Sequence, residues 1–96
     1  MDPFNIIIQA GSETIDLNIH PQEAGSYKVI YHGALIGEVF LGTSGWEAVT
    51  AEMLQPGGFP VYEYDENSGH EKILLSDDVV QAIGIEIAKA SNGSAM

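Results

Sequence analysis

A β-hairpin is predicted by the sequence SYKVIYHGALIGEVFLG of residues 26–42. Tyr27, Val29 and Tyr31 share one face of its first strand, because strand side chains alternate between the two faces of a sheet. Gly33 permits the reversal of the chain, after which ALIGEVFL supplies the partner strand. The alternation places the tyrosines beside apolar neighbours, so we interpret this stretch as hairpin core first and as a site second.

Further strands are predicted on both sides of this hairpin from short β-branched or aromatic runs bounded by turn residues. These runs are residues 4–10, 13–19, 46–50, 61–66 and 70–76. Gly37, inside the second strand of the central hairpin, predicts a bulge or a close approach by another backbone or a bulky ring. Residues 51–60 contain two prolines and two adjacent glycines, which favours an irregular loop there.

A C-terminal helix is predicted from about residue 77 to residue 90. Ser76 can cap its first turn, and two aspartates follow that complement the helix dipole. Its apolar positions recur at spacings of three and four, as on a helix with one buried face: Val79, Val80, Ile83 and Ile87. Gly84 lies beside this face, and close packing against a sheet would explain a glycine there.

The predicted fold class is therefore α+β: a small antiparallel β-meander of five to seven short strands with one C-terminal helix packed on one face. Residues 1–90 form one predicted domain, and residues 91–96 resemble a flexible tail or a cloning scar. Neither a signal peptide nor a transmembrane stretch is visible, so we expect a soluble chain without membrane attachment. The chain has no cysteine, which leaves the redox compartment open and the cytosol as the default location.

The charge balance is strongly acidic, with a net charge of −11 and only three lysines as cations. Because phosphate and nucleic acid are held by arginine forks or lysine clusters, direct binding to nucleic acid is disfavoured. An anionic surface favours a cationic partner, although it also serves solubility alone.

Catalytic and metal-binding patterns are missing from the sequence. No segment supplies a nucleophile, an orienting group and an electrophilic stabiliser together, so we expect no enzyme activity. Residues 65–76 have oxygen ligands at alternate positions, but His70 and Ser76 stand where a calcium loop needs glycine and glutamate. The three histidines do not have the helical spacing of a zinc site, and we predict neither a metal nor a cofactor.

One segment combines aromatic and acidic side chains and is our candidate interface. Tyrosines and carboxylates alternate there after a Pro-Gly loop, so aromatic anchors and an acidic rim fall within one short strand. A plain strand with its tyrosines packed under the helix explains the same pattern equally well. The candidate residues are Tyr62, Glu63, Tyr64, Asp65, Glu66 and Glu71.

The predicted function is that of a small, acidic, non-enzymatic domain that binds a protein with a basic surface, such as an inhibitor or immunity-type protein. In composition and size alone, the chain is similar to many toxin-immunity proteins, phage-encoded inhibitors and small bacterial proteins of unknown function, a similarity that transfers no residues. The alternatives are a small-ligand or calcium-binding module and a protein with no ligand. Exposed edge strands of a meander also favour a homodimer.

Overall fold

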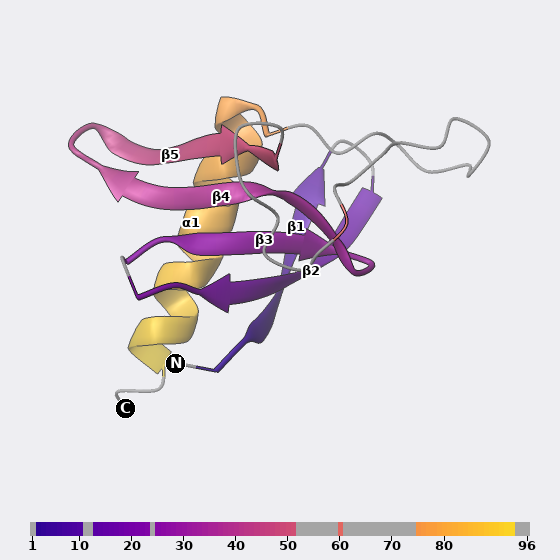
Figure 1. Cartoon of the computed structure of the whole chain (residues 1–96). Coiled ribbons are helices and arrows are strands. Elements are labelled where there is room, and N and C mark those ends of the chain that lie inside the picture. Colours follow the sequence, from indigo (N-terminus) through magenta and orange to yellow (C-terminus); the bar gives the residue numbers. More distant parts are fainter. Residues whose placement is uncertain (1, 11–12, 24, 52–59, 61–74, 94–96) are drawn as a thin grey trace.

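The computed structural model describes residues 2–10, 13–23, 25–51, 60 and 75–93. These residues form five strands and one helix: β1 (Phe4–Ala10), β2 (Glu13–Pro21), β3 (Tyr27–Tyr31), β4 (Ala34–Gly42), β5 (Gly45–Thr50) and α1 (Asp77–Gly93). The strands pair in sequence order as one antiparallel sheet, and α1 lies along one side of it (Figure 1). The predicted α+β meander with a C-terminal helix is confirmed.

Tight turns allow each strand to pair with the next one. His32 and Gly33 join β3 to β4 with φ angles of 48° and 81°, and positive φ at both loop residues is what a type I′ hairpin turn requires. Glycine adopts this conformation at no steric cost, and histidine does so more readily than most residues. The reversal predicted at Gly33 therefore takes place in two residues.

The helix begins and packs as its sequence predicts. The Ser76 hydroxyl accepts a hydrogen bond from the Val79 N–H at 3.4 Å, which satisfies one unpaired donor of the first turn. Val80, Ile83 and Ile87 are buried against the sheet, and Val79 is half-buried at the border. The helix ends at Gly93, beyond the predicted end at residue 90.

The main core lies between α1 and the face of the sheet that α1 covers. Each strand contributes alternate side chains to it, and Tyr27, Tyr31 and Trp46 pack at its border, the two tyrosines as predicted. The rings of Tyr27 and Trp46 have centroids 6.0 Å apart, within the range of favourable aromatic pairs. The fully buried side chains include Leu17, Ile19, Val29, Val39 and Ile83.

Two glycines are required by close packing. A Cβ added at Gly84 would collide with the ring of Trp46, so the helix can lie directly on β5 only because no side chain is present there. A Cβ added at Gly37 would lie 2.5 Å from both Leu75 Cδ1 and the Val49 carbonyl oxygen. Both predictions of close approach are confirmed.

A β-bulge moves one side chain to the second face of the sheet. Val29 pairs with Gly37 and Ile30 with Leu35, so Ile36 has no partner of its own on β3. Ile36 joins the main core, whereas Leu35 forms a small second cluster with Ile30 and Ala51 on the face opposite α1. The Leu35 N–H donates to the Pro60 carbonyl oxygen at 2.7 Å, so residue 60 lies beside β4, because strand N–H groups point along the plane of the sheet.

Candidate functional site

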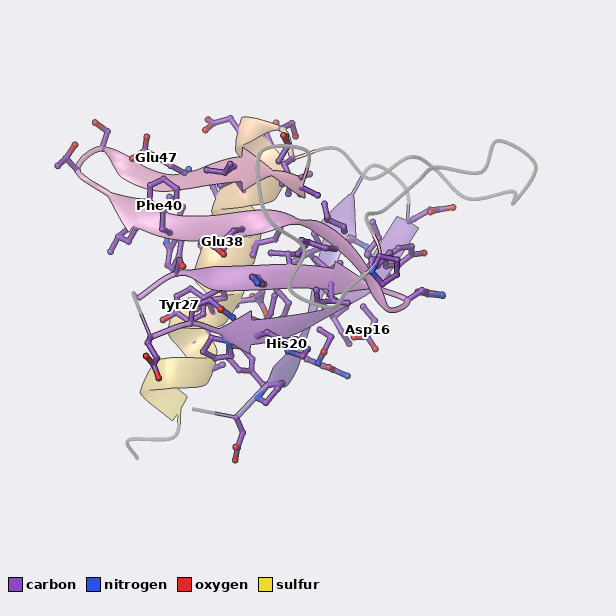
Figure 2. All side chains as sticks on the ribbon, in the orientation of Figure 1. Asp16, His20, Tyr27, Glu38, Phe40 and Glu47 are labelled. Carbon is purple, nitrogen blue, oxygen red and sulfur yellow. The ribbon has the colours of Figure 1, made fainter. Side chains whose placement is uncertain are left out.

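The face of the sheet opposite α1 carries most of the exposed functional groups of the strands, and we call it the outer face. Its members follow from strand alternation and the pairing register: Asn5, Ile7, Gln9, Thr14, Asp16, Asn18, His20, Lys28, Ile30, Leu35, Glu38, Phe40, Glu47 and Val49. Figure 2 views this face directly, with Asp16, His20, Glu38, Phe40 and Glu47 labelled on β2, β4 and β5. Acidic, amide and apolar groups are therefore mixed on one surface.

A row of paired residues crosses the centre of the outer face. His20 on β2 is opposite Lys28 on β3, which is opposite Glu38 on β4. The Ser26 hydroxyl, which is buried, donates to Glu38 Oε2 at 2.8 Å and holds this carboxylate in place. A positioned carboxylate can accept further hydrogen bonds from a cationic group.

A second hydrogen-bonded group lies toward β1. Asn18 Nδ2 donates to Asn5 Oδ1 at 2.7 Å and to the Phe4 carbonyl oxygen at 3.5 Å. Asn18 Oδ1 forms a short hydrogen bond with His20 Nε2, so the ring nitrogen is the donor in this pair. These bonds fix the amide orientation of Asn18 and connect β1 to β2 through side chains.

Two hollows flank Asp16 and His32 near the tip of the β3–β4 hairpin. One, of about 420 Å³, is lined by Asn5, Asp16, Asn18, Ile30, His32 and Gly33. The other, of about 410 Å³, is lined by Glu13, Thr14, Ile15, Asp16, Tyr31 and His32. The His32 ring packs on Tyr31 with centroids 4.2 Å apart, which positions the imidazole between the two hollows.

The groups that the outer face presents include amides, carboxylates, a lysine, an imidazole and apolar side chains. No group of three or more histidine, aspartate and glutamate side chains among the described residues is placed to hold a metal ion. The Ser26 hydroxyl donates its hydrogen bond to a carboxylate, that of Glu38. Hydrogen bonding, charge and apolar contact are what the outer face can offer a partner.

The six residues of the predicted aromatic and acidic interface lie outside the described residues. They are Tyr62, Glu63, Tyr64, Asp65, Glu66 and Glu71, and their role stays a prediction. Sequence reasoning missed the outer face, although the alternation of Asp16, Asn18 and His20 in β2 was a signal for it.

Comparisons with known proteins do not assign this chain to a family: no family model, no curated protein and no solved structure matches it. Within the part of the chain that the structure describes, α1 is neither long nor apolar enough to cross a membrane.

Proposed function

We propose that the protein is a small, acidic, non-enzymatic binding domain that engages a basic surface on another protein, as an inhibitor or immunity-type protein would. The observation that supports this proposal is the outer face: the sheet surface opposite α1, on which Asp16, Glu38 and Glu47 project among amides and the half-buried Phe40. Carboxylates steer a cationic partner, and a desolvated aromatic contributes affinity. A cytosolic location is part of the same proposal.

The predicted interface of Tyr62, Glu63, Tyr64, Asp65, Glu66 and Glu71 belongs to this proposal as a second acidic segment. Pro60, directly before this segment in the chain, lies beside β4 through its bond to Leu35.

Capture of a partner from the native host, followed by binding kinetics, tests the proposal. The variant pair Asp16→Lys with Glu47→Lys reverses two exposed carboxylates of the outer face. Because complementary charge raises the association rate, this pair should slow association by about tenfold, and added salt should slow the parent in the same way. Glu63→Lys with Asp65→Lys tests the second segment, and Tyr64→Ala should speed dissociation.

The matched control is Asp2→Lys with Glu23→Lys, which makes the same charge change at exposed positions outside the outer face. The control should retain most of the parent association rate. If association slowed equally in the control and in the outer-face pair, the effect would come from net charge and not from the outer face. Binding that is insensitive to salt and to every charge reversal would overturn the proposal.

A small polar ligand is the second candidate function, and one observation favours it. The hollow beside Asn5, Asp16 and His32, at about 420 Å³, falls within the size range of small-molecule sites. Calorimetry with calcium, zinc and a metabolite set discriminates the two functions, because tight stoichiometric binding that is lost in Asp16→Asn and His32→Ala would favour the ligand over the protein partner.

A further inference from the structure

The two edges of the sheet differ in how well they are protected from another strand. Gly42 and Gly45 close the two-residue loop between β4 and β5, so this pair exchanges backbone hydrogen bonds and the backbone of Trp46 points away from β4. Gln81 Nε2 on α1 donates to the Trp46 carbonyl oxygen at 2.7 Å. The helix thus occupies one acceptor of the β5 edge, and the exposed charge of Glu47 adds to its protection.

Among the residues that the structure describes, none gives the β1 edge either form of protection. By the same alternation, counted from the pair of Ala10 with Glu13, the backbone groups of Asn5, Ile7 and Gln9 point away from β2. Among the strands that the structure describes, β1 has only β2 as its neighbour. Its seven residues, FNIIIQA, include no charge and no proline, and Ile7 is 59% exposed.

We propose that β1 is a dimerisation edge and that its occupant is β1 of a second copy of this chain. The edge is self-complementary about Ile7. In an antiparallel pair centred there, the two Ile7 residues are opposite each other and Asn5 of one copy is opposite Gln9 of the other, so outward backbone groups meet outward groups. The result is one continuous sheet across both copies, with an isologous interface.

Charge favours this edge over the β5 edge, which carries the exposed Glu47, for self-association. Two chains of net charge −11 repel each other, and an uncharged strand is where they can approach with the least repulsion. The amides of Asn5 and Gln9 can exchange hydrogen bonds, while the two Ile7 side chains bury each other on the outer face. Salt screens the repulsion, so salt should strengthen the dimer, whereas it weakens the binding of a basic partner.

Sedimentation equilibrium over a thousand-fold range of concentration, at low and high salt, tests the proposal. The parent should move from monomer to dimer mass as concentration rises, with at least a tenfold tighter dissociation constant at high salt. Ile7→Pro removes the outward N–H that the second copy needs and leaves the bonds between β1 and β2 intact, as an edge strand tolerates. This variant should remain monomeric with an unchanged circular dichroism spectrum.

Ile7→Lys serves as a second variant should the proline disturb the strand, because an exposed edge lysine blocks pairing without burying a charge. The matched control is Ile85→Lys, which makes the same change at a 54% exposed position on α1 and should dimerise as the parent does. A parent that stays monomeric throughout, or a dimer that survives both Ile7 variants, would overturn the proposal. Neither result affects the expected outcome of the outer-face charge reversals. The dimer proposal and the basic-partner proposal can therefore be overturned independently.

Discussion

A single ring and a single missing methyl group determine how closely α1 approaches β5. Replacing Gly84 by alanine in a free helix gains about 1 kcal/mol of helix preference. Here the added Cβ would collide with the Trp46 ring, and overpacking costs about 1 to 3 kcal/mol. We expect Gly84→Ala to lower the free energy of unfolding in urea. In a Trp46→Leu background the same change should raise it, and the same sign in both backgrounds would show that the ring is not the cause.

The backbone conformation of His32 supports a second residue-scale prediction. Its φ of 48° is tolerated by histidine and asparagine but strained for a β-branched residue. His32→Val should lower the free energy of unfolding by about 1 to 2 kcal/mol relative to His32→Asn. Both variants lose the ring contact with Tyr31, so thermal denaturation of the pair isolates the backbone term. Equal melting temperatures would contradict a strained turn.

At the scale of elements, α1 stabilises the sheet through one buried face. Ile83 is fully buried and Ile85 is 54% exposed on the same helix, so the two positions form a matched pair. Ile83→Asp should unfold the protein or nearly so, because an unpaired buried carboxylate costs several kcal/mol, whereas Ile85→Asp should cost less than about 1 kcal/mol. Circular dichroism melting curves distinguish them. If the Ile83→Asp protein were folded and melted at the same temperature as the parent, α1 would not be part of the core.

The elements were predictable to the extent that local pattern determines them. Alternation in β2, the turn at Gly33 and the capped apolar face of α1 depend on neighbours within a few residues of each other. Gly37 indicated a bulge or a close approach in this part of β4, but which residue would lack a partner was not predictable, because it depends on how β3 and β4 share their partners. The hydrogen bond from Gln81 to Trp46 joins residues 35 apart in sequence, and no local pattern indicates it. The outer face was missed as a site because the alternation in β2 indicates only one polar strand face, and the mixed surface exists only once five strands are in register.

For the whole molecule, the net charge of −11 makes the folded chain repel itself. Raising sodium chloride from about 10 mM to about 150 mM shortens the Debye length from about 30 Å to about 8 Å, which screens this repulsion. The urea midpoint should therefore rise with salt at neutral pH, measured at low protein concentration so that dimerisation does not contribute. Urea is required because an ionic denaturant would itself screen the charges.

The Asp16→Lys with Glu47→Lys pair is the control for this salt effect. Each change replaces one negative charge by one positive charge, so the pair shifts the net charge from −11 to −7 without altering the core. Its urea midpoint at low salt should exceed that of the parent, and its dependence on salt should be weaker, because less repulsion remains to be screened. If the parent and the variant gained equally from salt, the increase would come from a general effect of the salt on protein hydration, and the acidity would carry no measurable cost in stability.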